Sequence, residues 1–306
     1  MANNKKAKRS LKYYLLLKPI ATTLRTLASI FLPPINPHPT TILHIPSRDS
    51  KRTIKLHIYT PPSPPKGPSP VLLNFCGSGF VIDGHGSDDH FCRYIAANTE
   101  FTVLDVQYRM SPEYPCPAPL EDAEDVLEWV RGQPGVYDVE RVGLSGFSAG
   151  GNLATGLAAN FPGGKWGFGC LVAFYPVVDA TRGRGRRRVA PDARGMKLPG
   201  WFVGFCTRAY LCDGVEAGDT RVSPLFRDGG EWGVRRVLLV SAARDCLAVE
   251  VEELGDRLGT VEGMSVVCER VEGCGHAWDK VAKEGSWGWE EKVRVYGMVV
   301  DLLKTV

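Results

Sequence analysis

The sequence predicts an α/β fold in which helices cover both faces of a mostly parallel, doubly wound sheet. Short apolar runs alternate along the chain with amphipathic segments of helical length, which is the pattern of strand–helix–strand units. A Gly-x-Ser-x-Gly segment lies at one strand-to-helix junction. The 306 residues, 44% of them hydrophobic, can bury a large core. We expect one domain over residues 1–306, although this length would also allow two smaller ones.

The N-terminal region predicts a helix that is not a membrane span. It begins with a cluster of basic residues, namely Lys5, Lys6, Lys8, Arg9 and Lys12. The apolar run 15–17 ends at Lys18 and Pro19, and Arg25 interrupts the next run, so no stretch reaches the ~20 residues of a spanning helix. Apolar residues then recur at helical spacing at Leu24, Leu27, Ala28 and Phe31. This face could pack on the protein's own body or lie on a membrane surface.

The next segments predict strands. Alternating apolar and polar residues over 41–45 and 54–59 indicate a half-exposed antiparallel pair, and the proline-rich segment 61–70 indicates an exposed connector. The apolar run 71–75 is expected to be a buried strand that leads into the glycine-rich turn 76–80, CGSGF. Such a turn can aim backbone amides at a phosphate or at an oxyanion. A phosphate site is disfavoured because no G-x-G-x-x-G and no Gly-Lys-Ser/Thr follows.

Strands and helices then alternate to the C-terminus. Helical patterns cover residues 88–98, 118–131, 152–159, 249–258 and 290–304. Apolar runs of strand length cover residues 101–107, 142–144, 170–174, 237–241 and 264–270. This alternation predicts parallel pairing, because each strand is followed by a crossover helix.

The segment 181–223 interrupts the alternation and is interpreted as an insertion between two strands. Its first part is rich in arginine, with Arg182, Arg184, Arg186, Arg187 and Arg188. Such a cluster is more often a solvated loop than a binding patch. Its second part is aromatic, with Trp201, Phe202, Phe205 and Tyr210, and predicts a short helix with an apolar face. A lid or cap over a pocket has this composition.

Composition argues against several classes of protein. A net charge of +3 is too small to indicate a nucleic-acid partner. The nine cysteines are odd in number and form no C-x-x-C pair, which argues against a disulfide framework and a structural zinc site. We therefore expect reduced, partly buried thiols in a cytoplasmic protein that could contact a membrane through its N-terminal helix.

The segment Gly146-Phe147-Ser148-Ala149-Gly150 predicts a nucleophile on a tight strand-to-helix turn. A side chain at either glycine would collide with the neighbouring backbone, and the helix that follows presents its free amides to a developing oxyanion. In a chain with 34 glycines this motif can also arise by chance. Whether the motif marks a nucleophile therefore depends on the other candidate catalytic residues in the sequence.

Acyl transfer by a serine requires a base, a carboxylate that orients the base, and amide donors for the oxyanion. His276 and Asp245 each follow a predicted strand, and with Ser148 they give the chain order Ser, Asp, His. Each has another interpretation, because His276 could be a surface loop residue and Asp245 could cap the helix that begins near 248. Asp179 is a rival carboxylate at the preceding strand end.

Together these motifs resemble the hormone-sensitive-lipase-like branch of the α/β hydrolases, the alpha/beta hydrolase fold-3 esterases. GFSAGGNLA at 146–154 is similar to that family's nucleophile elbow, and YRMSPE at 108–113 is similar to its YRLAPE signature. PAPLEDA at 117–123 resembles the segment that follows, and Asp245-Cys246-Leu247 stands where the family has Asp-Pro-Leu. CGSGF at 76–80 stands where the family has HGGGF. The resemblance extends from about residue 54 to the C-terminus.

The resemblance implies roles for these residues. Ser148 would be the nucleophile, His276 the base and Asp245 its orienting carboxylate. The backbone amides of Ser78, Gly79 and Ala149 would form the oxyanion hole. No metal or organic cofactor is implied. Arg109 and Glu113 would be structural, and a helical cap would be built from about residues 1–40 plus the insertion 181–223.

The expected activity is hydrolysis of carboxylic esters with a small or medium acyl group, and the expected partner is a small-molecule ester rather than a nucleic acid. Two departures from the family, Cys76 for histidine and Ser78 for glycine, motivate a second hypothesis, against which the presence of Ser148, Asp245 and His276 argues. In it the scaffold is repurposed as a ligand-binding receptor or a lyase. Neither the particular ester nor the oligomeric state follows from the sequence.

Overall fold

The computed structural model describes residues 13–161, 167–182, 198–211 and 214–306. The sheet has eight strands in the order β1-β2-β4-β3-β5-β6-β7-β8. They are β1 Thr41–Pro46, β2 Thr53–Tyr59, β3 Ser69–Phe75, β4 Thr102–Val106, β5 Tyr137–Phe147, β6 Cys170–Phe174, β7 Arg236–Ala242 and β8 Ser265–Val271. The pairs β1–β2 and β2–β4 are antiparallel, and the pairs from β4 to β8 are parallel. The predicted α/β fold with a mostly parallel sheet is confirmed.

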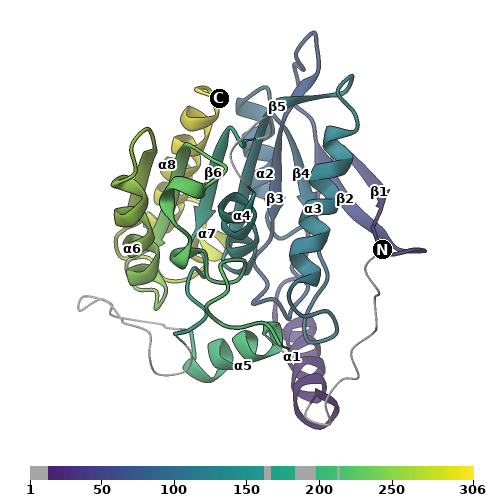
Figure 1. Cartoon of the computed structure of the whole chain (residues 1–306), viewed down its shortest axis with the longest axis vertical. Coiled ribbons are helices and arrows are strands. Elements are labelled where there is room, and N and C mark those ends of the chain that lie inside the picture. The colour runs from purple at the N-terminus through teal and green to yellow at the C-terminus, as the bar shows by residue number, and fades with distance from the viewer. Residues whose placement is uncertain (1–12, 162–166, 183–197, 212–213) are drawn as a thin grey trace.

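Helices cover both faces of this sheet (Figure 1). They are α1 Lys18–Phe31, α2 Asp89–Asn98, α3 Ala118–Arg131, α4 Ala149–Asn160, α5 Gly200–Tyr210, α6 Ala248–Gly259, α7 Trp278–Val281 and α8 Trp287–Leu303. Apolar residues of α3, α4 and α6 share one buried cluster with the sheet, and those of α2 and α8 share another. The sheet is therefore buried on both faces, as a parallel sheet requires.

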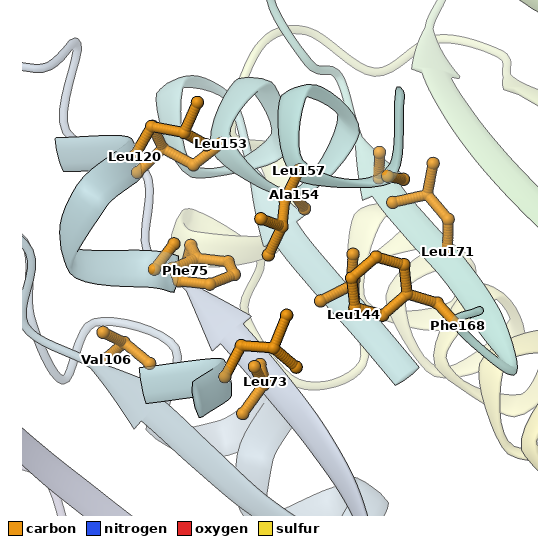
Figure 2. Packing of buried hydrophobic residues seen from close by; sticks show 14 of the residues in the cluster. Leu73, Phe75, Val106, Leu120, Leu144, Leu153, Ala154, Leu157, Phe168 and Leu171 are labelled. Carbon is orange, nitrogen blue, oxygen red and sulfur yellow. The ribbon is translucent and has the colours of Figure 1, made fainter. Parts of the chain in front are cut away.

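Helix α4 is buried along nearly its whole length, and its first residues are small. Figure 2 shows Leu153, Ala154 and Leu157 of α4 facing Phe75 and Leu144, which come from the neighbouring strands β3 and β5. All five of these side chains are at most 1% exposed. This packing fixes the start of α4, where Ser148 is placed, relative to the end of β3.

The predicted strands are found, but the burial of one differs from the prediction. The structure confirms the antiparallel pairing of the segments 41–45 and 54–59, and β1 is half exposed as predicted. Strand β2 is instead mostly buried, because it lies between β1 and β4 rather than at an edge. The predicted connector 61–70 also ends early, since Ser69 already begins β3.

The predicted N-terminal helix exists as α1, and only part of its predicted apolar face packs on the protein. Leu17, which closes the π-helical turn Tyr13–Leu17, and Ala21 contact the aromatic helix α5 and the segment after β3. Leu27 and Phe31 of the predicted face are 45% and 76% exposed. The predicted face is therefore divided, because Leu24 packs on the body of the protein while Leu27 and Phe31 remain exposed. Figure 1 shows α1 and α5 together below the sheet.

Candidate active site at the carboxyl edge of the sheet

Ser148 lies on the turn between β5 and α4, in a conformation that non-glycine residues rarely adopt, with φ 52° and ψ −115°. The glycines around it permit this turn. A Cβ on Gly146 would lie 2.3 Å from the carbonyl oxygen of Gly150, and one on Gly150 would lie 2.0 Å from that of Phe75. No side chain fits at these distances, so the sequence must place glycine at both positions for the turn to close.

The structure brings the predicted Ser148, His276 and Asp245 together. His276 Nε2 lies 2.9 Å from Ser148 Oγ, and His276 Nδ1 lies 2.5 Å from Asp245 Oδ2. A carboxylate can only accept, so His276 Nδ1 donates a hydrogen bond to Asp245, and Nε2 is the nitrogen that can accept a hydrogen bond from the Ser148 hydroxyl. Asp245 is buried at 1% exposure, whereas Ser148 at 9% and the His276 side chain at 12% retain a small accessible area.

The alternatives for the carboxylate are resolved by geometry. Asp245 also accepts a hydrogen bond from the backbone amide of Leu247 at 3.2 Å, so it caps the turn before α6 with one oxygen while the other faces His276. Asp179 instead pairs with Arg182 at 2.7 Å and accepts the Thr181 hydroxyl at 2.6 Å.

The predicted oxyanion loop follows β3 and lies beside Ser148. A Cβ on Gly77 would be in ordinary contact with the Cβ of Ser148, at 3.6 Å. Within the described part of the chain, the amides of Ser78, Gly79 and Ala149 have no backbone or side-chain acceptor. Gly79 has a φ of +55°, which favours glycine. Free amides beside a serine hydroxyl are the arrangement that stabilises a developing oxyanion.

The two departures in this loop have defined environments. Cys76 is fully buried, and burial raises the pKa of its thiol, so it is a neutral packing residue. Ser78 is not among the residues with positive φ, so the position accepts a side chain. Its hydroxyl accepts a hydrogen bond from the backbone amide of Phe80 at 2.8 Å and lies 2.7 Å from the Tyr108 hydroxyl.

Helix α5 contacts this loop. A Cβ on Gly79 would lie 3.0 Å from the Cys206 sulfur and 3.5 Å from the ring of Phe202. The aromatic segment that the sequence placed in an insertion therefore packs directly on the predicted oxyanion hole. Of the basic cluster 182–188, only Arg182 lies within the described residues.

Arg109 and Glu113 form ion pairs away from Ser148. Arg109 bonds Asp122 at 3.0 Å and Asp49 at 2.7 Å, so it joins the loop after β4 to α3. Glu113 pairs with Arg25 of α1 at 2.7 Å. That pair fixes α1 to the body of the protein, which fits the structural part expected of both residues.

A buried ionic cluster beneath the site was not found from the sequence. Lys280 Nζ lies 2.7 Å from Asp88, 2.9 Å from Asp279 and 3.4 Å from the centre of the Phe147 ring. Burial lowers the pKa of Lys280, but the two carboxylates outweigh it and hold that pKa above its usual value. No spacing rule pairs residue 280 with residue 88, so only the tertiary structure could reveal this cluster.

The same cluster reaches the ring that packs on His276. Asp279 accepts hydrogen bonds from the hydroxyl of Tyr175 at 2.5 Å and from that of Tyr296 at 3.0 Å. The Tyr175 ring lies 4.8 Å from the imidazole of His276. Lys280 therefore ties the loop that carries His276 to Asp88, which precedes α2 and follows the predicted oxyanion loop.

One group in the described part of the chain has the composition of a metal site. Its donor atoms, from His57, His85 and Asp105, lie within 4.8 Å of one another and are buried. The two imidazoles are stacked, with ring centres 3.9 Å apart and 25° between planes, so their in-plane lone pairs do not converge on one point. His85 Nε2 also lies 3.1 Å from the Asp105 carbonyl. Neither ring nitrogen of His57 has a hydrogen-bond partner among the described residues. The geometry fits two stacked imidazoles, one of them hydrogen-bonded to the Asp105 carbonyl, better than metal coordination.

The profile of the alpha/beta hydrolase fold family matches residues 72–280, which is more than half of the chain. The chain belongs to this family. The resemblance to its fold-3 esterases, the hormone-sensitive-lipase-like branch, is confirmed.

The similar proteins carry esterase names. The chain is 39% identical to an esterase, LipI, of Mycobacterium tuberculosis over 34% of each chain. It is 31% identical to an ethyl acetate hydrolase of Pseudomonas putida over 60% of this chain and 58% of the relative. The solved hyperthermophilic esterase of Pyrobaculum calidifontis superposes with a TM-score of 0.75 at 25% identity, covering 94% and 91% of the two chains. Matches to the first curated relatives span from about a third to two thirds of their length.

None of the helices described here has both the length and the apolar character that crossing a membrane requires.

The Lys280→Met substitution should strongly destabilise the protein, because it leaves Asp88 and Asp279 buried without their cation. We expect the free energy of unfolding to fall by roughly 3–5 kcal/mol. Lys304→Met is the matched control, since Lys304 forms an exposed pair with Asp301 and should change stability by less than about 1 kcal/mol. Urea unfolding followed by tryptophan fluorescence measures both. Equal midpoints would contradict the importance of the buried cluster.

Proposed function

We propose that this protein is a serine hydrolase that cleaves carboxylic esters of small to medium acyl chain through an acyl-enzyme intermediate. The observation that carries the proposal is the hydrogen-bonded chain from Ser148 through His276 to Asp245, with distances of 2.9 and 2.5 Å. Membership of the alpha/beta hydrolase fold family and the esterase names of its relatives support the same reaction.

In the acylation step, Ser148 Oγ attacks the ester carbonyl while His276 Nε2 takes the serine proton. Asp245 keeps the Nδ1 proton in place and stabilises the imidazolium that forms. The carbonyl oxygen becomes an oxyanion that accepts hydrogen bonds from the amides of Ser78, Gly79 and Ala149. The loss of one such donor typically costs about 10²–10³ in kcat.

Collapse of this intermediate breaks the bond to the alcohol, and the imidazolium of His276 donates its proton to the leaving oxygen. In the second step His276 removes a proton from a water molecule, which attacks the acyl-serine. The second tetrahedral intermediate then expels Ser148, which recovers its proton from His276. The acid is released and the starting protonation state is restored.

A second candidate function is a repurposed scaffold that binds or eliminates rather than hydrolyses. Cys76 and Ser78 in the oxyanion loop motivate it, because both differ from the family pattern. The hydrogen-bonded Ser148, His276 and Asp245 favour hydrolysis instead, because a receptor has no need of this chain.

Ser148→Ala should abolish turnover of p-nitrophenyl acetate and butyrate and leave the fold intact. Because the attacking oxygen is lost, we expect kcat/KM to fall by at least about 10⁴. The wild-type chain should also be labelled by a fluorophosphonate probe, and the variant should not. Ser145→Ala, the other serine near the turn, is the control for labelling. Equal ester turnover by wild type and Ser148→Ala would refute the proposed nucleophile, and an unlabelled wild-type chain would favour the scaffold function.

We propose further that the N-terminal segment, up to about residue 40, and the insertion 181–223 form a cap that limits the acyl group. The contacts of Leu17 and Ala21 with α5 join the two segments, and Phe202 of α5 lies against Gly79. An aromatic ring at this place restricts the space above the oxyanion loop. The esters that fit would then be those with short acyl chains.

Phe202→Ala should shift preference toward longer acyl chains, because it removes the ring that faces Gly79. We expect the ratio of kcat/KM for p-nitrophenyl octanoate to that for the acetate to rise by about tenfold, the effect of one or two methylene contacts. Phe226→Ala, at a 43% exposed ring outside the cap, is the control. An unchanged ratio in Phe202→Ala would remove this residue from the acyl site.

We also propose that α1 contacts an anionic membrane surface. Its last turn and the residues after it expose apolar side chains at Leu27, Ile30, Phe31, Leu32 and Ile35. The basic residues of the sequence between 5 and 12 precede this helix and lie outside the described residues. An apolar face next to basic residues is the combination that binds anionic interfaces.

Phe31→Ser should weaken binding to phosphatidylserine vesicles by about tenfold, because one large apolar side chain is lost from the contact. Val136→Ser is the control, at a 55% exposed position before β5. Vesicle co-sedimentation at low and high salt measures both variants. Binding that is absent in wild type, or equal in wild type and Phe31→Ser, would count against membrane contact through α1.

A further inference from the structure

We propose that the hydroxyls of Ser78 and Tyr108 are a brace that holds the oxyanion loop in its working conformation. Both side chains have a positioning role, and neither hydroxyl touches the reacting atoms. The inference rests on the proposed ester hydrolysis and explains how the loop functions without the histidine of the resembled family. The inference follows from which group is the donor in each hydrogen bond of the brace.

Tyr108 is 2% exposed, and its hydroxyl donates to the carbonyl of Cys76 at 2.7 Å. A phenol has a single proton, so this bond leaves Tyr108 only acceptor capacity. The Ser78 hydroxyl, 2.7 Å from the Tyr108 oxygen, must therefore be the donor in that contact. The backbone amide of Phe80 then donates to Ser78 Oγ at 2.8 Å.

The three hydrogen bonds therefore run in one direction. The Phe80 amide donates to the Ser78 hydroxyl, which donates to the Tyr108 hydroxyl, which donates to the Cys76 carbonyl. Together these bonds join both ends of the turn 76–80 to the loop after β4. They also exclude the Ser78 side chain as an oxyanion donor, because its single proton is committed to Tyr108. Ser78 can act on the oxyanion only through its backbone amide.

The brace is needed because the turn is strained. Gly79 and Phe80 are consecutive residues with φ of +55° and +63°, and the second has a side chain. Phe80 is held by its stacking on Tyr210, with ring centres 3.7 Å apart, and by its carbonyl, which accepts the amide of Ser111 at 2.7 Å. The Ser78 hydroxyl supplies the remaining partner, the acceptor for the Phe80 amide.

The carbonyl of Ser78 takes part in the same turn. It accepts the amides of Val81 at 3.1 Å and of Ile82 at 2.9 Å. Carbonyl and hydroxyl of Ser78 thus both accept from residues that follow it, and its peptide plane cannot rotate without breaking these bonds. Because the Ser78 carbonyl and the Gly79 amide belong to one peptide plane, these bonds keep the Gly79 amide available for the oxyanion.

The test measures catalysis and the binding of a transition-state analogue in Ser78→Ala, Ser78→Thr and Tyr108→Phe. In Ser78→Ala we expect kcat for p-nitrophenyl butyrate to fall by about tenfold to a hundredfold with KM unchanged, because only the transition state uses the amides. The inhibition constant of a trifluoromethyl ketone should rise by the same factor. Ser78→Thr keeps the hydroxyl and should recover most of the activity.

Tyr108→Phe removes the acceptor of the Ser78 proton and should lower kcat in the same way. The double variant Ser78→Ala/Tyr108→Phe should lose less than the product of the single losses, because both residues act through one chain of hydrogen bonds. Ser265→Ala, at an exposed position on β8, is the control and should match wild type.

Ser78→Ala with wild-type kcat and wild-type inhibitor affinity would overturn the brace and leave the proposed hydrolysis intact. A loss of stability without a change in kcat at a temperature where the variant is folded would overturn it as well. A wild-type chain that turns over no ester would overturn the proposed function itself, and the catalytic role of the brace with it.

Discussion

The turn at Ser148 is the constraint on which the candidate site depends. Its φ of 52° and ψ of −115° cost about 1–3 kcal/mol in a non-glycine residue. The turn keeps this conformation because backbone hydrogen bonds to the flanking elements hold it in place. The Ser148 amide donates to the carbonyl of Phe174 at 2.9 Å, and its own carbonyl accepts the amide of Asn152 at 3.0 Å. With β5 and α4 both buried, the hydroxyl can face only the loop that carries His276.

The parallel strands place the other groups at the same edge, but the loops that carry them need separate anchors. Burying charges is costly, yet Lys280 is held between Asp88 and Asp279, where it links the loop of His276 to the start of α2. Asp88 lies in the segment that leads from the oxyanion loop, residues 76–80, to α2, so this ion pair joins the loop of the proposed base to the segment that follows the proposed amide donors. We infer that the buried cluster maintains geometry rather than taking part in the chemistry.

The sequence predicted the elements better than it predicted their surroundings. Strand β6 was predicted with its observed bounds, and Ser148, Asp245 and His276 were placed at strand ends because motif and chain order are local properties. The predicted face of α1 packs only in part, through Leu24, and leaves Leu27 and Phe31 exposed. A stripe of apolar residues shows only that a helix has a face, and the packing partner α5 lies far along the chain. The burial of β2 was missed for the same reason, because the sequence of a single segment does not determine where its strand lies in the sheet.

The sequence by itself determined the fold class, the family and the identity of the residues that meet at the carboxyl edge, because periodicity and glycine-dependent turns act over a few residues. The tertiary structure alone decided which contacts those residues make. It paired Asp245 rather than Asp179 with His276, placed Lys280 between two buried carboxylates, and set Ser78 against Tyr108. These contacts join residues from about thirty to nearly two hundred positions apart, and only the closing of the sheet and its loops brings them within hydrogen-bond distance.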